Sequence, residues 1–335
     1  MANDYDILSE ITACYIFRGM MVPRRRRKRM KKANKMIGLA ALMAGAGGLA
    51  ASRMKPSTRA YIESVGWHRP DLWLHGMFYM SHTLEYIAMG RFATGFARYV
   101  PNHMKKHYAD TYHGKLVPLE EAQKLVTVTE DVEVRNLENI VPYKTCKDII
   151  LKNPDAILAC KCVCRMTSPN HCQPDEVCMV IGEPYVSFIL DHQPDFCRRV
   201  TAEEAVEILR QTDEAGCLHA AFFKDVTRGR FYAICNCCSC CCIAIKSHRF
   251  LGIPFYGHSG LEPAFSDECN GCCKCVKACI FEALSANGKK EPPVLDREAC
   301  MGCGACRAAC EQDAITLVEA VGRPAPLRLD ELLAD

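Results

Sequence analysis

Several common functional signatures are missing from this sequence. It contains no glycine-rich phosphate-binding loop and no flavin-binding fingerprint. It also lacks the C-x-x-C-H motif through which c-type haem is attached. No catalytic base or activated nucleophile stands out, so we do not expect the chain to catalyse a reaction by itself. Its uncharged run Met36–Ala51 has sixteen residues, fewer than the about twenty that a membrane-spanning helix needs.

Cysteine, in contrast, is abundant, with 24 among 335 residues. Many of these cysteines are arranged as C-x-C, C-C and C-x2-C. Cysteines this close in sequence do not easily form disulfides with one another, but they can share a metal centre. We therefore expect reduced thiolates bound to metal in a reducing compartment, and so much thiol chemistry indicates an anaerobic cell.

The C-terminal part contains two four-cysteine runs with the same spacing, C-x2-C-x2-C-x3-C, thirty-one residues apart. This repeat is typical of bacterial two-cluster ferredoxins, in which the fourth cysteine of each run ligates the other cluster. Zinc is the alternative, but structural zinc sites use paired C-x2-C knuckles. The sequence therefore predicts two [4Fe–4S] clusters, one held by Cys269, Cys272, Cys275 and Cys310 and the other by Cys300, Cys303, Cys306 and Cys279.

The surroundings of the two runs resemble bacterial-type ferredoxin domains. Gly271, Gly302 and Gly304 lie where the backbone must approach inorganic sulfide and donate N–H bonds to it. The proline that usually follows the fourth cysteine is replaced by Ile280 in the first run and by Glu311 in the second. Glu311 adds a negative charge near a cluster, so a reduction potential cannot be transferred from the family.

A second cysteine-rich module spans residues 156–250. Its ten candidate metal ligands are Cys162, Cys164, Cys172, Cys178, Cys235, Cys237, Cys238, Cys240, Cys241 and Cys242. A strand alternates its side chains, so six of them within CNCCSCCC cannot all reach one metal unless a tight turn divides them. They suffice for one or two further iron–sulfur clusters, or for a cluster and zinc; the alternative is a core that is simply lined with cysteine.

Arg165 follows the C-x-C pair of this module and would offset the negative charge of its thiolates. The remaining cysteines of the region and its neighbours have no spacing partner, and we interpret them as non-ligands: Cys146, Cys160, Cys197, Cys217 and Cys273.

The C-x-C-R motif, the phrases TAEEAVEIL and FYAICNCCSCCC, and the C-terminal double run together resemble a group of uncharacterised 4Fe–4S binding proteins of anaerobic bacteria. The resemblance covers residues 90–320. It implies iron–sulfur electron transfer and names no substrate.

We predict an α+β fold in four segments: a basic and apolar arm (1–55), a mainly helical region (56–155), the cysteine-rich module (156–250) and a two-cluster ferredoxin-type domain (255–325). Within the second segment, prolines separate helices over residues 56–115, and Arg91 and Arg98 form a basic stripe. Short strands are indicated by Val126, Val128, Val132 and Val134. Residues 144–151 are predicted to form a helix. Thr201 and Glu204 form a capping box at the start of another helix, and residues 231–234 form a strand.

The arm carries most of the positive charge. Residues 1–60 have a net charge of +10, and subtracting this from the +3 of the whole chain leaves −7 for the remainder. Residues 24–32 read RRRRKRMKK and precede the uncharged run. The run is a weak membrane anchor, a helix buried against protein, or a signal sequence; the basic residues favour attraction to anionic lipid. A nucleic-acid partner is disfavoured because aromatic residues do not interleave the charges.

The chain is therefore predicted to be an iron–sulfur electron-transfer subunit that relays electrons between redox partner proteins of an anaerobic oxidoreductase system. We expect it in the cytoplasm, with residues 24–51 attaching it to the inner face of the cytoplasmic membrane. One alternative is a catalytic reductase subunit with a substrate-binding cluster in the middle module. The other is a zinc-stabilised scaffold or nucleic-acid-binding protein.

Overall fold

The computed structural model describes residues 54–143, 148–169, 171–288 and 290–334. From Lys55 onward these residues belong to one compact unit, Lys55–Asp335. The predictions for the basic run, the uncharged run and Cys146 lie outside the described residues. None of the helices in the described ranges combines the length and apolarity needed to cross a bilayer.

The helices after residue 55 begin where the prolines predict. Pro56 and Pro70 each occupy the first position of a helix, and Pro101 caps another. The helices are α3 (Pro56–Val65), α4 (Pro70–Ser81), α5 (Thr83–Thr94), the 3-10 turn η1 (Ala97–Tyr99) and α6 (Asn102–Thr111). Helical structure ends at residue 111, four residues earlier than predicted, because the next residues form a central strand.

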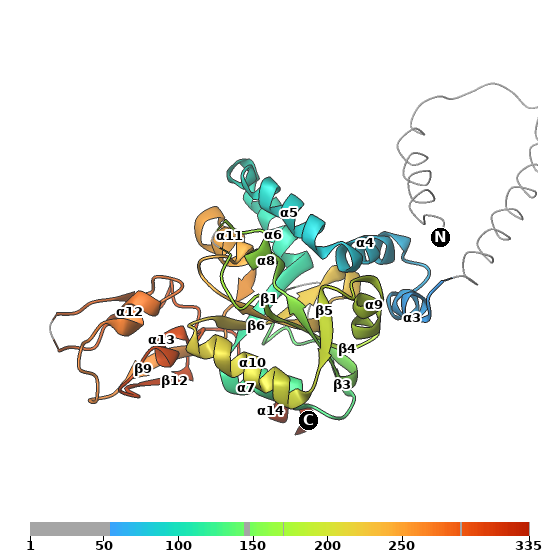
Figure 1. Cartoon of the computed structure of the whole chain (residues 1–335). Helices are drawn as coiled ribbons and strands as arrows, with labels where there is room; N and C mark the ends of the chain where they lie inside the picture. The colour runs from blue at the N-terminus through green and yellow to red at the C-terminus, as the bar shows by residue number, and fades with distance from the viewer. Residues whose placement is uncertain (1–53, 144–147, 170, 289, 335) are drawn as a thin grey trace, which may run out of the picture. The chain divides into compact units, whose positions relative to one another are not determined.

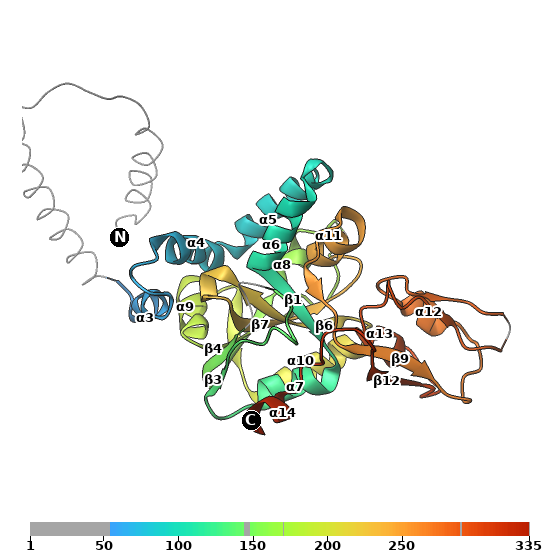
Figure 2. The same ribbon diagram turned by 180° about the vertical axis from the view of Figure 1, so that it is seen from behind.

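An eight-stranded sheet forms the centre of the molecule (Figures 1 and 2). Its strands are β1 (Tyr112–Val117), β2 (Val132–Val134), β3 (Ile149–Lys161), β4 (Glu176–Glu183), β5 (Cys197–Val200), β6 (Leu218–Lys224), β7 (Arg230–Cys237) and β8 (Tyr256–Gly257). Their order is β2-β3-β4-β7-β6-β1-β8, with β5 beside β3, and only the β1–β8 pairing is parallel among these strands. The sheet crosses the predicted boundary at residue 155, and the four-segment division stays a prediction.

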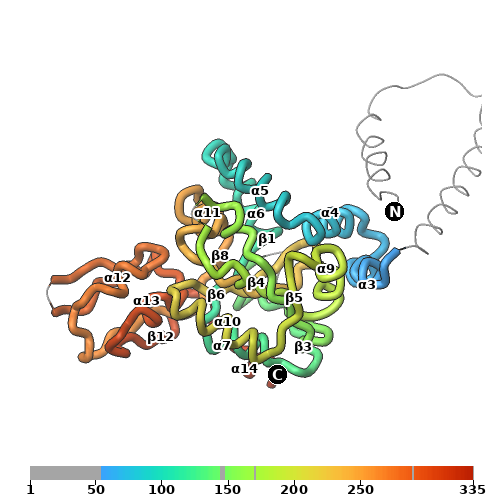
Figure 3. Tube along the Cα trace, viewed as in Figure 1, coloured from blue at the N-terminus to red at the C-terminus, as the bar shows by residue number. Residues whose placement is uncertain are grey.

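Helices cover both faces of the sheet. One face packs against α7 (Leu119–Thr127), α10 (Ala202–Glu214) and α14 (Leu329–Ala334) around an aliphatic core. On the other side lie α4, α5 and α6 together with α8 (Val163–Met166), α9 (Tyr185–His192) and α11 (Ile243–Leu251) (Figures 1 and 3). Ile157 and Ala159 of β3 belong to the aliphatic core, so by alternation Cys160 faces the other side.

Two secondary-structure predictions are wrong. Val126 lies in helix α7 and not in a strand, because Ala122, Leu125 and Val126 form a buried helical face against the sheet. Ile149–Lys161 is a strand where the sequence predicts the end of a helix. Ile149 and Leu151 are buried in the sheet core, and the chain passes Pro154 at an irregularity in the pairing with β4.

Other local predictions are confirmed. The Thr201 hydroxyl accepts a hydrogen bond from Glu204 N, and the Glu204 carboxylate accepts one from Thr201 N, which completes the capping box of α10. The strand predicted at residues 231–234 is β7, which extends to Cys237.

The C-terminal elements lie beside the sheet, in orange and red in Figure 1. They are β9 (Leu261–Phe265), α12 (Lys274–Ala278), β10 (Leu284–Ser285), β11 (Val294–Leu295), α13 (Ala305–Ala308) and β12 (Ile315–Glu319); the turn η2 (Asp225–Thr227) connects β6 to β7. Strand β12 pairs with β9, and β10 with β11. The predicted α+β class is confirmed.

Candidate metal centres

Two small cavities in the C-terminal part are each lined by four cysteines of the two runs, and Cys273 also lines the first of them. The first C-terminal site comprises Cys269, Cys272, Cys275 and Cys310. The second C-terminal site comprises Cys279, Cys300, Cys303 and Cys306. Each site takes three cysteines from one run and the fourth from the other, which is the crossed grouping that the repeat predicts. Ligation itself stays a prediction.

The donor chemistry of both sites fits an iron–sulfur cubane, whose irons are held by thiolates. Cys275 of the first site and Cys306 of the second are buried with Leu284 and Ile315 in one small apolar core. Burial raises the pKa of Cys306 to about 12, so metal must replace the thiol proton before this side chain carries its charge. The shared apolar core holds the two sites together and limits access of water to them.

Close backbone approach requires glycine at two points beside these sites. Gly302 has a φ of +64°, and a Cβ there would lie 1.9 Å from the carbonyl oxygen of Leu261. Gly271 has a φ of +67°, and a Cβ there would lie 2.7 Å from the backbone of Lys290. The sequence suggested that these glycines allow approach to inorganic sulfide. In the folded chain, the neighbouring backbone leaves no room for a Cβ at either position.

The two positions that depart from the ferredoxin pattern have different surroundings. Glu311 forms an ion pair with Lys274, which belongs to the other cysteine run. Both side chains are exposed, so the pair contributes little to stability, but it offsets part of the added negative charge. Ile280, at the other position, is buried.

The ten candidate ligands of the middle module divide into two groups in space. Strand β7 ends at Cys237, a turn follows, and Cys242 is the residue that precedes α11. The four-thiol site consists of Cys172, Cys238, Cys240 and Cys241. The other six line a second cavity, which Cys160 and Cys238 also border, and are called the six-thiol ring: Cys162, Cys164, Cys178, Cys235, Cys237 and Cys242. The turn therefore separates cysteines that a continuous strand would have placed in one row.

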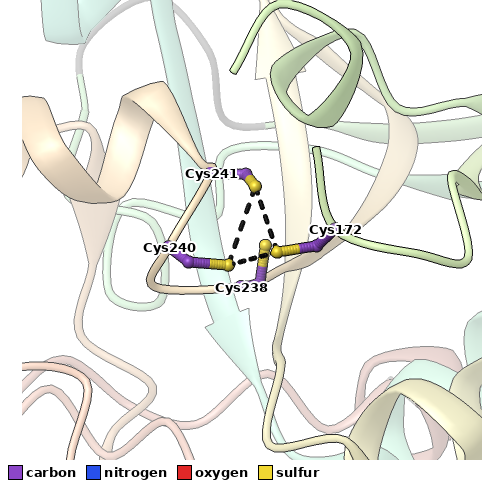
Figure 4. Close-up of side chains that lie close together, drawn as sticks. All are labelled: Cys172, Cys238, Cys240 and Cys241. Carbon is purple, nitrogen blue, oxygen red and sulfur yellow. Dashed lines mark hydrogen bonds between the residues drawn. The ribbon is translucent and has the colours of Figure 1, made fainter. Parts of the chain in front are cut away.

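The four-thiol site is compact (Figure 4). The Cys172 sulfur lies 2.6 Å from that of Cys240 and 3.3 Å from that of Cys241, and the sulfurs of Cys240 and Cys241 are 3.6 Å apart. All four sulfurs, including that of Cys238, lie within 4.8 Å of one another. A tetrahedral ion with metal–sulfur distances of about 2.3 Å requires sulfur–sulfur distances of about 3.8 Å. The site is therefore suited to a single tetrahedral ion.

Thiol acidity favours metal uptake at this site. Desolvation acts to raise the pKa of Cys241, but hydrogen bonds from Cys172 outweigh it and lower the pKa to about 7. A large fraction of this thiol is therefore ionised near neutral pH, and thiolate is the form that binds metal.

Arg165 is buried among the thiols, as its place in the sequence suggested. Its guanidinium donates to the Cys217 sulfur at 3.4 Å and to the Pro174 carbonyl. Burial acts to lower the pKa of Arg165, but Cys217 and Cys238 outweigh this effect and raise it. Its Nε has no hydrogen-bond partner among the described residues. A buried arginine with a free donor suits a neighbourhood that carries negative charge once metal is bound.

No pattern in the sequence indicates that Arg91 connects the two cysteine segments. Its guanidinium donates to the carbonyl oxygens of Cys164 at 3.0 Å and Cys241 at 3.2 Å, and to the Thr167 hydroxyl at 3.2 Å. The prediction that Arg91 belongs to a basic stripe is therefore wrong, because its guanidinium contacts other segments of the same chain. Its partners are 73 and 150 residues away, so no local pattern could have revealed this contact.

The cysteines without a spacing partner have other neighbours. Cys160 and Cys197 pair across β3 and β5, and the Cys197 sulfur donates to the carbonyl oxygen of Gln193 at 3.3 Å. The Cys273 sulfur donates to the carbonyl oxygen of Gly271 at 3.5 Å. That these cysteines do not bind metal stays a prediction.

Comparison with known protein families finds a 4Fe-4S binding domain at residues 293–316. This segment contains the second C-terminal cysteine run. No curated protein and no solved structure matches the chain. Together with the clustered thiols, the match shows that this is an iron–sulfur protein with metal-binding capacity in its middle module as well.

Proposed function

Taking the 4Fe-4S binding domain at residues 293–316 as the premise, we propose that the protein transfers electrons between redox partner proteins. The C-terminal sites would hold two [4Fe–4S] clusters in the crossed grouping, and the middle module would extend the path. When bound, such a cluster accepts and releases single electrons. The chain supplies ligands, insulation from water and a fixed arrangement of the sites.

The observation that carries this proposal is an aromatic bridge between the second C-terminal site and the six-thiol ring. Phe281 lines the cavity of the second C-terminal site. Its ring centroid lies 6.4 Å from that of Tyr256, whose hydroxyl lies 3.4 Å from the sulfurs of both Cys237 and Cys242. His248 packs beside both aromatic rings. A continuous packed connection thus joins the two cysteine-rich parts.

Polar contacts support a fixed position of the C-terminal part on the sheet. Arg249 of α11 forms an ion pair with Glu282, next to Phe281. Arg307 of α13 forms another with Glu120 of α7, at 2.9 Å. The buried Lys115 ammonium donates to the carbonyl oxygens of His258 and Ala325 at 2.7 and 2.9 Å. These contacts hold the aromatic bridge in place.

Exposure suggests where a partner protein would exchange electrons. Cys272 of the first C-terminal site is exposed, whereas Cys237 and Cys242 of the ring are buried. A partner can therefore approach the first C-terminal site most closely. The expected path leads from there through the second C-terminal site to the ring.

The test is the Phe281→Ala variant of the full-length protein, prepared anaerobically with its metal content verified. Rapid reduction by a chemical donor, followed spectroscopically, should give several-fold slower equilibration between the C-terminal and middle-module signals. Phe250→Ala is the matched control, because it removes an exposed aromatic ring from α11. Equal rates in the wild type and Phe281→Ala would contradict the relay.

The geometry of the four-thiol site supports the binding of a structural metal ion. The compact spacing of the four-thiol site favours a single ion, zinc or iron, over a cubane. Such an ion would cross-link the Cys172 loop to the turn after β7. We propose this as a stabilising role inside an electron-transfer protein.

We further propose a cytoplasmic protein that residues 24–51 attach to the inner face of the membrane, on the strength of their charge and apolarity. The protein should sediment with anionic vesicles at low salt, and a variant without residues 24–51 should stay in the supernatant. Equal distribution of the two proteins would refute the attachment.

A further inference from the structure

The six-thiol ring is closed. The pKa of each thiol is shifted by its side-chain interaction with two others, in the order Cys162, Cys164, Cys242, Cys237, Cys235, Cys178 and back to Cys162. No member is set apart from the rest. The ring therefore offers six neighbouring thiols to one occupant.

The fold explains why these six meet. Cys235 and Cys237 are two residues apart on β7 and face the same side of the sheet. Cys178 lies on the neighbouring strand β4, and Cys162 directly follows β3. Cys164 lies in α8, and Cys242 precedes α11. The ligands thus come from several separate elements of a rigid sheet.

The ring borders a cavity of about 120 Å³. The other side of this cavity is formed by Tyr79, Met80 and Ile87 from α4 and α5, and by Tyr232 from β7. Protein interiors contain few voids larger than a water molecule, which needs about 10–15 Å³. The cavity beside the six thiols therefore has room for an occupant.

Sulfur spacing distinguishes a cluster from a single ion. Among the described residues, the four-thiol site is the one group of three or more metal-ligand side chains whose ligand atoms all lie within 4.8 Å of one another. The ring does not meet that spacing, and neither do the two C-terminal sites. A single zinc ion needs the compact arrangement. The ring therefore resembles the C-terminal sites, for which the repeat predicts iron–sulfur clusters.

From these observations we propose that the six-thiol ring binds a single iron–sulfur centre larger than a cubane, with all six thiolates as ligands. A cubane has four irons and takes one thiolate for each, so it would leave two buried thiols of the ring without metal. Arg165 lies near Cys162 and Cys178 and provides positive charge, while the Tyr256 hydroxyl donates to Cys237. The inference rests on the proposed iron–sulfur function and specifies the size of one centre.

The test compares the iron and sulfide content of anaerobically purified full-length variants. Cys178→Ala and Cys237→Ala each remove one ring member from a different strand. Cys160→Ala is the matched control, a buried cysteine of β3 that lines the same cavity outside the ring. We expect each ring variant to lose the same amount of iron, more than four atoms per chain, and the control to lose none. The electron paramagnetic resonance signal of the C-terminal clusters should remain in all three, which separates this result from a failure of the proposed function.

Two outcomes would overturn the proposal: a loss of four irons or fewer, or a ring variant that keeps its full iron content. Loss of zinc in place of iron would overturn it as well. If an alanine variant is insoluble, the serine variants at the same positions carry the comparison, because a hydroxyl fills nearly the same space.

Discussion

Removing one hydroxyl group should shift the reduction potential of the centre in the six-thiol ring. Tyr256 is buried, and its hydroxyl lies 3.4 Å from the sulfurs of Cys237 and Cys242. Burial, followed by the charge of these two thiols, raises the pKa of Tyr256 well above its usual value. The hydroxyl therefore keeps its proton and acts as a hydrogen-bond donor to sulfur.

The direction and size of the shift follow from charge. A reduced centre carries one more negative charge than an oxidised one, so a donor stabilises the reduced form more. A hydrogen bond to a charged group contributes about 1.5–3 kcal/mol, and at this distance the difference between the two redox states is about 1 kcal/mol. For a one-electron couple, a tenfold change in the equilibrium constant corresponds to 59 mV, so Tyr256→Phe should lower the potential by about 40 mV.

The assay is a redox titration of the anaerobic full-length protein, monitored by electron paramagnetic resonance, with equal iron content in both proteins as a precondition. Tyr185→Phe is the control, because it also removes a buried hydroxyl, one that donates to Thr227 O at 3.4 Å. The control should leave the potential unchanged. A shift upward, or one smaller than about 10 mV, would refute the idea that Tyr256 stabilises the reduced centre.

Three further predictions concern the supports of the metal sites. Arg91→Ala should lower the free energy of unfolding of the metal-loaded protein by about 2 kcal/mol in denaturant titrations, because two charged hydrogen bonds to the cysteine segments are lost. The control Arg98→Ala removes only an exposed contact with a tyrosine ring and should lower the same free energy by less than about 1 kcal/mol. Gly302→Ala should abolish the cluster signal of the second C-terminal site, whereas Gly322→Ala, with a φ of +76° and open space around it, should cost only about 1–2 kcal/mol and keep all iron. Cys310→Ala should remove the cluster of the first C-terminal site; loss of the second site's signal with the first intact would show that the ligands are not crossed.

Local patterns in the sequence were sufficient for several parts of the fold. The helices that begin at Pro56 and Pro70, and the capping box before α10, depend on residues only a few positions apart. The crossed grouping of cysteines in the two C-terminal sites joins runs thirty-one residues apart, and it was predicted because the repeat is typical of two-cluster ferredoxins. Residues 149–151 were misassigned to a helix because burial between neighbouring strands, and not local propensity, decides their conformation.

Spacing along the chain was enough to predict that the middle module has ten closely spaced thiols, enough for more than one metal centre, and that a turn must divide the last six of them. Which thiols share a centre depends on how the chain folds. Cys172 joins the turn cysteines, while Cys178, six residues later, joins the ring. That choice depends on the antiparallel pairing of β4 with β7 and on the contacts of Arg91, which connect segments far apart in the chain. No spacing rule encodes such contacts, because they exist only once the sheet has formed.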